Sequence, residues 1–198
     1  DYAIPVPADC TSGGVAHLWP TAVYFDPVRR LFSLLPGAGT VQLQGFKGAL
    51  IEQQGHRICQ GSGATMAAAA TAFLTLHLAY VIGTILDRDP TARISGVNIA
   101  VPVASLNDRA DCPHFDNVVR AAILLIPKAP SFTLIDVEAA LASSEAGALP
   151  HDLHAELSGA IAGYCRSPRH FDGSHMIIDC GSATLDIASF KLGPDSHP

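Results

Sequence analysis

The pattern of apolar and polar positions changes along the chain, and each change predicts a different structural element. Short runs of β-forming residues cover 21–25, 31–35 and 41–43, separated by the turn signals Asp26-Pro27 and Pro36-Gly37. The first two runs predict a β-hairpin, and the third extends the same sheet. The residues before this sheet are rich in Pro, Gly and Ser, which is typical of a loop or tether.

The stretch from Ala64 to Leu86 carries no charged residue, counting histidine as neutral, and is long enough to cross a membrane. Alanine and threonine dominate it, His77 lies at its middle, and it lacks an aromatic belt and a basic flank, which disfavours a membrane span. One helical stripe consists of Leu74, Leu78, Val81 and Ile85. We therefore expect a buried core helix that ends at Asp89-Pro90.

The following part of the chain alternates between strand and helix signals. In chain order the pattern predicts strand 94–103, a helix-cap signature at 105–108, helix 115–126, strand 132–135, helix 137–142 capped by Asp136, helix 152–164 and loop 165–170. Such alternation is typical of an α/β layer architecture.

Near the end, an apolar run from Met176 enters a tight turn of small residues and leaves as a second apolar run to Phe190. This pattern predicts a β-hairpin. The turn carries Asp179, Thr184 and Asp186. Small residues let backbone N–H groups approach an anion, and carboxylates can hold a divalent metal through water. The alternative is a buried hairpin whose Asp and Thr side chains satisfy backbone groups.

Composition limits the class of protein. Of 198 residues, 48% are hydrophobic and 15% charged, so the chain is globular, as one large domain or two small ones. The net charge of −6 and the lack of a Lys/Arg-rich run argue against nucleic-acid binding.

Cysteine usage indicates the compartment. Five cysteines are odd in number and irregularly spaced, which favours reduced thiols over a disulfide framework. No secretion signal is visible, and we therefore expect a cytoplasmic protein. Cysteines and histidines that could bind zinc are Cys112, His114, His151, His154, Cys165 and His170. Because they lack the paired spacing of structural zinc sites, we do not expect zinc.

Five segments together suggest a family. They are Pro20–Asp26, Phe46-Lys47 followed by Leu50-Ile51, Val101-Pro102 with Asn107-Asp108, Ile135–Ala142, and the turn Asp179-x-Gly181-x-x-Thr184-x-Asp186. In this order they resemble the nucleotide-binding domain of DnaK-type heat-shock chaperones, within the actin-like ATPase superfamily. The resemblance covers residues 20–144 and 175–192.

The resemblance implies a partial ribonuclease-H-like α/β fold, with most of the first lobe and the first hairpin of the second. It divides the chain into a loop or tether (1–20), an outer subdomain (21–90), a core subdomain (91–174) with an insertion at about 145–174, and the second phosphate-loop hairpin (175–198).

The same resemblance implies ATP and magnesium as ligands. Lys47 would place positive charge near the γ-phosphate, and Asp179 would hold magnesium through its water shell. The residues assigned to nucleotide binding are Gly181, Ser182, Ala183, Thr184 and Asp186. Of these, Thr184 would orient the attacking water or the phosphate, and Asp186 would brace the hairpin. Without the resemblance, Lys47 is a surface lysine on a short helix.

Departures from the family pattern leave the function open. The family's first phosphate hairpin is not found before residue 20. In the second phosphate turn, two of the family's three glycines are replaced by Ser182 and Ala183, and the family's E-P-T reads Val137-Glu138-Ala139. One expectation is a chaperone-like protein that couples ATP binding and hydrolysis to conformational change in an attached segment. We expect the region present here to bind ATP weakly and not to hydrolyse it.

The alternative is a non-catalytic interaction module that no longer binds nucleotide. An actin-like filament subunit is a third possibility that no distinct feature supports. Expected partners are nucleotide and a protein client, with no nucleic acid or membrane. An exposed sheet edge could also mediate self-association.

Overall fold

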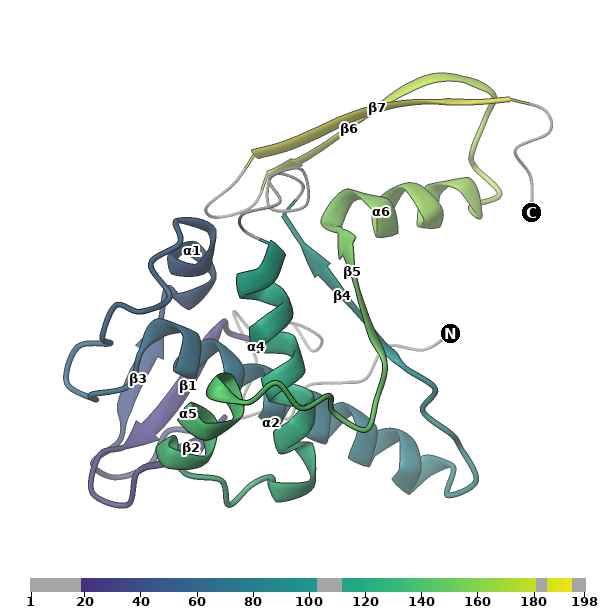
Figure 1. The fold of residues 1–198 in the computed structure, drawn as a ribbon. Coiled ribbons are helices and arrows are strands. Elements are labelled where there is room, and N and C mark those ends of the chain that lie inside the picture. Colours follow the sequence, from purple (N-terminus) through teal and green to yellow (C-terminus); the bar gives the residue numbers. More distant parts are fainter. Residues whose placement is uncertain (1–18, 103–111, 181–184, 194–198) are drawn as a thin grey trace. The chain divides into compact units, whose positions relative to one another are not determined.

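The computed structural model describes residues 19–102, 112–180 and 185–193 (Figure 1). The chain divides into two compact units. The first unit comprises Asp1–Val97 and His114–His151, and the second comprises Asn98–Pro113 and Asp152–Pro198. Each unit is described by itself, and together they are of mixed α/β class, as the alternating pattern predicts. The helix-cap signature at 105–108 lies outside the described residues.

The first unit contains an antiparallel sheet of three strands in the order β2-β1-β3. Its strands are β1 (Ala22–Asp26), β2 (Leu31–Ser33) and β3 (Val41–Gln44). The Asp26 carboxylate accepts hydrogen bonds from the backbone N–H groups of Val28 and Arg29 at 2.9 and 3.0 Å, which closes the β1–β2 turn. The predicted hairpin and its third strand are confirmed.

Two helices follow this sheet. Helix α1 (Phe46–Ile51) buries Phe46, Ala49 and Leu50. Helix α2 (Met66–Arg88) begins where the Thr65 side chain accepts a hydrogen bond from the N–H of Ala68 at 3.1 Å, and ends at Asp89. A serine, threonine, aspartate or asparagine at this position stabilises a helix start because it satisfies a free N–H group. The helix is also long and apolar enough to span a membrane.

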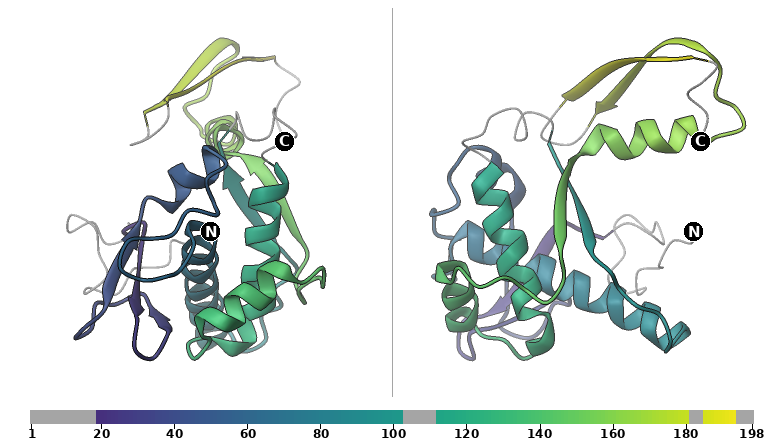
Figure 2. Two further views of the ribbon diagram at one scale, coloured as in Figure 1. Left: turned by 60° about the vertical axis from the view of Figure 1, so that its left-hand side comes forward. Right: turned by 45° about the vertical axis from the view of Figure 1, so that its right-hand side comes forward.

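The predicted buried stripe of α2 is wrong in its residues. Leu74, Leu78, Val81 and Ile85 are all partly exposed, and the buried positions in the first half of the helix are mostly alanine and threonine. The fully buried ones are Ala68, Ala69, Thr71, Ala72 and Thr75. In Figure 2, α2 lies between the sheet and the helices α4 (Cys112–Leu125) and α5 (Leu134–Ala142). Small side chains are needed there because α2 is covered from two sides.

Helix α4 is confirmed, and a short 3-10 helix, η2 (Ile126–Lys128), follows it. The predicted strand over 132–135 is wrong, because α5 begins at Leu134. Thr133 is the N-cap and Asp136 is the third helical residue, and each side chain accepts a hydrogen bond from the backbone of the other. This capping box starts the helix three residues before the predicted start at Val137, despite the β-forming residues.

The second unit is built from strand pairs and one helix. Strand β4 (Val97–Val101) pairs with β5 (His151–Ala155), although the first residue of each strand belongs to the first unit. Helix α6 (Glu156–Cys165) follows. The predicted helix 152–164 is therefore wrong at its beginning, where the chain forms β5.

The predicted C-terminal hairpin is confirmed. Strands β6 (Gly173–Cys180) and β7 (Leu185–Leu192) pair antiparallel over their whole lengths. Helix α6 runs beside this hairpin (Figure 1). Leu157 of α6 and Leu192 of β7 are buried, so the unit has a small apolar core on this side of the hairpin.

Candidate functional site

The strand register brings two acidic residues together beside the hairpin turn. Asp179, the next-to-last residue of β6, lies directly opposite Asp186, the second residue of β7. Residues directly opposite in an antiparallel pair share one face of the sheet, with Cβ atoms about 4.5–5.5 Å apart, and like charges there are destabilising. The register thus marks this pair of acidic residues as a candidate cation site.

The residues Gly181, Ser182, Ala183 and Thr184 lie outside the described part of the chain. Asp179 is exposed at the end of β6. The structure thus confirms the predicted hairpin and shows that Asp179 and Asp186 are register partners. The roles assigned to these two residues and to the four residues between β6 and β7 stay predictions.

Lys47 lies in the first unit, on α1. It is exposed, whereas its neighbour Phe46 is buried and fixes the start of the helix. Gly45, the residue before Phe46, has φ of 76°. Glycine adopts this left-handed conformation without steric cost. Lys47 and Asp179 belong to different units, each described separately. The prediction that they act on one nucleotide stays a prediction.

The two faces of the hairpin differ. On one face, Met176, Ile178 and Ile187 are 65%, 57% and 55% exposed, and Ile178 lies directly opposite Ile187. On the other face, His175 and Phe190 lie opposite each other with ring centroids 5.2 Å apart. The sequence analysis did not single out the exposed face, although the alternation of side chains along β6 could have revealed it.

An aromatic cluster holds the second face against α6. The His175 ring lies 5.1 Å from the Tyr164 ring of α6 and 5.0 Å from the Phe171 ring, and its Nε2 lies 2.8 Å from the carbonyl oxygen of Phe171. Tyr164 also meets Phe190 edge-on at 6.3 Å. These contacts anchor the hairpin, and the sequence analysis did not identify any of them.

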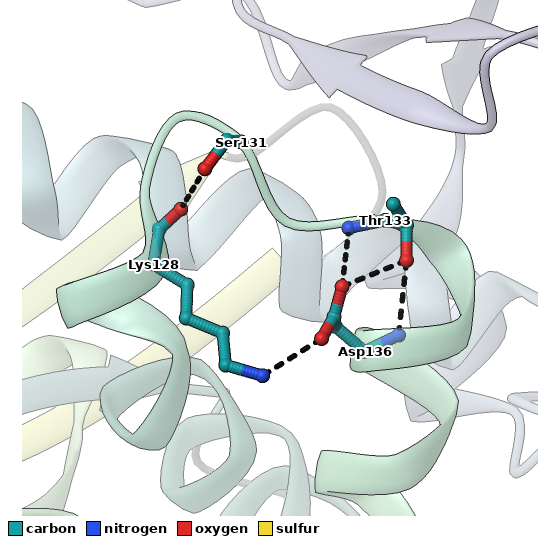
Figure 3. Close-up of polar contacts among 4 residues, drawn as sticks. All are labelled: Lys128, Ser131, Thr133 and Asp136. Atoms are coloured by element: carbon teal, nitrogen blue, oxygen red, sulfur yellow. Dashed lines mark hydrogen bonds and ion pairs between the residues drawn. The ribbon is translucent and has the colours of Figure 1, made fainter.

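A second polar cluster lies at the start of α5 (Figure 3). Lys128 Nζ donates to Asp136 Oδ1 at 2.7 Å, while Asp136 Oδ2 accepts from the N–H and the hydroxyl of Thr133 at 2.9 and 2.7 Å. Lys128, followed by the Thr133 hydrogen bonds, holds the pKa of the Asp136 carboxyl well below its usual range.

This cluster borders a pocket of about 360 Å³, which Glu145 also lines. Both oxygens of Asp136 already accept hydrogen bonds from Lys128 and Thr133. The cluster is therefore best explained as a reinforced helix cap. Glu138, the residue matched to the family's E-P-T, is exposed on the same helix.

Metal-ligating residues are scattered. Within the described residues, no group of three or more His, Cys, Asp or Glu side chains could hold a metal ion. His151 Nε2 lies 3.0 Å from Asp116 Oδ1 in the first unit. Cys59, Cys165 and Cys180 are free thiols. Two opposed aspartates on the hairpin do not form such a group, and water would have to supply the remaining ligands of a magnesium ion there.

Comparisons of the chain with protein-family models, curated proteins and solved structures found no significant match.

Proposed function

We propose that the chain is part of a chaperone-like, ATP-binding protein with the ribonuclease-H-like fold of the actin-like ATPases. The observation that carries this proposal is the register of the β6–β7 hairpin, which places Asp179 opposite Asp186. In the sequence, the connecting residues 181–184 are all small. A turn of this kind can approach phosphate oxygens with backbone N–H groups, and a divalent cation would relieve the repulsion between the two aspartates.

In this proposal each residue has a defined task. Asp179 holds magnesium through water, with Asp186 as the second acidic residue directly opposite it in the strand register. Gly181 and Ser182 present backbone N–H groups to phosphate oxygens, and Thr184 orients the phosphate or the attacking water. Lys47 stabilises negative charge that develops on the transferred phosphoryl group. ATP binding would be coupled to conformational change in an attached segment.

The binding is expected to be weak in the chain described here. Ser182 and Ala183 add Cβ atoms where phosphate oxygens would approach the turn. The chain also has one recognised phosphate hairpin, whereas the related ATPases clamp the phosphates between two. Each missing charge-assisted hydrogen bond costs about 1.5–3 kcal/mol, so losing a few of them lowers affinity by several powers of ten.

Isothermal titration calorimetry with Mg-ATP tests the proposal. We expect weak binding, near a Kd of about 1 mM, without measurable hydrolysis, and a further loss in the Asp179→Asn variant. Asp152→Asn, an exposed aspartate in the same unit, serves as the matched control and should bind like the unmodified chain. Equal binding by the Asp179→Asn and unmodified chains would contradict the assignment of the site to the hairpin.

A second candidate function is a non-catalytic interaction module. The exposed apolar face formed by Met176, Ile178 and Ile187 supports it, since contiguous apolar surface often marks an interaction site. The two hairpin strands pair with each other alone among the described strands, so each leaves a free edge for another strand. Complete absence of Mg-ATP binding would favour this function over the first.

A further inference from the structure

A series of aromatic ring contacts, all tilted or edge-on, connects the segment before β1 to α1 and α2 in the first unit. The Trp19 ring lies 4.5 Å from the His77 ring and 5.2 Å from the Tyr80 ring, both on α2. His77 lies 5.2 Å from Phe73, and Phe73 lies 5.3 Å from Phe46 of α1. Neither the hairpin nor the proposed nucleotide site involves this cluster.

His77 is the polar member of the cluster. Its Nδ1 is buried and has no hydrogen-bond partner among the described residues. The ring contacts that the structure gives for His77 are with Trp19 and Phe73, which are both uncharged. Tyr80 is the titratable group that meets the same tryptophan, and Lys47 follows Phe46 on the neighbouring helix. No carboxylate is in contact with His77 in the described part of the chain.

Protonation would place a positive charge and a second N–H donor on a side chain that is partly buried and whose Nδ1 is fully buried. A buried donor without an acceptor is unfavourable because its hydration is lost and not replaced. Burial lowers the pKa of His77 accordingly. The opposing effect is a cation–π attraction to the rings of Trp19 and Phe73. Both rings are tilted to the imidazole by more than 50°, and neither supplies the missing acceptor.

We propose that His77 and Trp19 form an acid-sensitive latch that holds the segment entering β1 against α2, and that protonation of His77 releases it. The folded chain takes up this proton at lower pH than the unfolded chain. The contribution of the latch to stability is therefore complete above the usual histidine pKa of about 6.5, and is lost as the pH falls below it.

Trp19 is the one tryptophan of the chain, so its fluorescence reports on the latch directly. In a titration from neutral to acidic pH, we expect the emission to shift to longer wavelength, and quenching by acrylamide to increase, with an inflection below pH 6.5. The His77→Phe variant keeps an aromatic ring but cannot titrate, and should lose the inflection. The His17→Gln variant, which removes the histidine nearest Trp19 in sequence, should keep it.

An unchanged inflection in His77→Phe, or its loss in His17→Gln, would overturn the proposal. If His77→Phe does not fold, the NMR titration of the His77 ring protons in the unmodified chain replaces it. A pKa below the usual value, together with an emission change at the same pH, supports the latch. A raised pKa would show that the cation–π attraction dominates and that acid tightens the contact.

Discussion

Asp179 lies directly opposite Asp186 in the antiparallel register of the β6–β7 hairpin. Like charges at directly opposed positions destabilise a strand pair by about 0.2–1 kcal/mol. In the absence of divalent cations, Asp179→Asn should therefore stabilise the second unit by about this amount. Urea denaturation, followed by the backbone amide NMR signals of the hairpin, measures the change in the free energy of unfolding.

Added magnesium should reverse the order of stability, so that the unmodified chain becomes more stable than the Asp179→Asn variant. If the ion binds the folded hairpin as proposed, the unmodified chain should gain stability, whereas Asp179→Asn should gain less. Asp152→Asn, which alters an exposed aspartate of the same unit, should behave like the unmodified chain. Magnesium stabilisation that is equal in all three proteins would contradict a role for this pair.

The capping box of α5 gives a second prediction. Thr133→Ala removes a cap hydroxyl whose oxygen accepts from the N–H of Asp136 at 3.3 Å, and should cost about 0.5–2 kcal/mol of unfolding free energy. Thr133→Ser keeps the hydroxyl and should lose much less. Thermal unfolding of the two variants provides the comparison, and equal losses would argue against the cap.

The pH dependence of stability follows from the same cluster. The pKa of Asp136 is lowered in the folded state, so its contribution is complete above the usual aspartate pKa of about 3.9 and is lost as the pH falls below that value. Asp136→Asn should flatten this part of the stability profile. Denaturation at a series of pH values from 5 downward tests it. A profile that keeps its slope in Asp136→Asn would assign the acid sensitivity to other carboxylates.

Close packing around α2 gives a further prediction. Ala72 is fully buried, so Ala72→Leu should overpack the layer between the sheet and α4 and cost about 1–3 kcal/mol. Ala139→Leu, at an exposed position of α5, should change stability by less than about 0.5 kcal/mol. Chemical denaturation of both variants measures the difference. If Ala72→Leu leaves the free energy of unfolding unchanged, α2 is not packed between two layers.

The exposed face of the hairpin predicts self-association at high protein concentration. Ile187→Lys places a charge on the face formed by Met176, Ile178 and Ile187, and should shift the chain toward monomer in analytical ultracentrifugation. Val28→Lys changes a residue that is 89% exposed in the first unit and should have no effect. If both variants shift toward monomer by the same amount, the association does not depend on this face of the hairpin but on exposed apolar residues in general.

Local patterns predicted the elements whose signals are strong in the sequence. The β1–β2 and β6–β7 hairpins carry β-forming residues around clear turns, and the structure confirms both. The start of α5 was not predicted because the sequence from Phe132 to Ile135 resembles a short strand. The reciprocal hydrogen bonds between Thr133 and Asp136 stabilise a helix there instead.

Tertiary contacts explain the remaining errors. The sequence of β5 contains few strand-forming residues, and the segment becomes a strand by pairing with β4. The buried positions of α2 are mostly alanine and threonine, because small residues allow close packing between its two neighbouring layers. Of the candidate site, the positions of Asp179 and Asp186 follow from the hairpin pattern. The aromatic contacts of His77 and His175 depend on packing between segments distant in sequence, which pattern reading does not reveal.

Binding of a metal-bound phosphate group by the hairpin of Asp179 and Asp186, as proposed above, can be tested with a paramagnetic ion. Manganese can replace magnesium in such sites, and its paramagnetism broadens the NMR signals of nearby nuclei. Added in small amounts with ATP, it should selectively broaden the backbone amide signals of residues 178–187, and this broadening should disappear in Asp179→Asn. Broadening that persists in that variant, or that centres on Lys128 and Asp136 in place of the hairpin, would contradict the account.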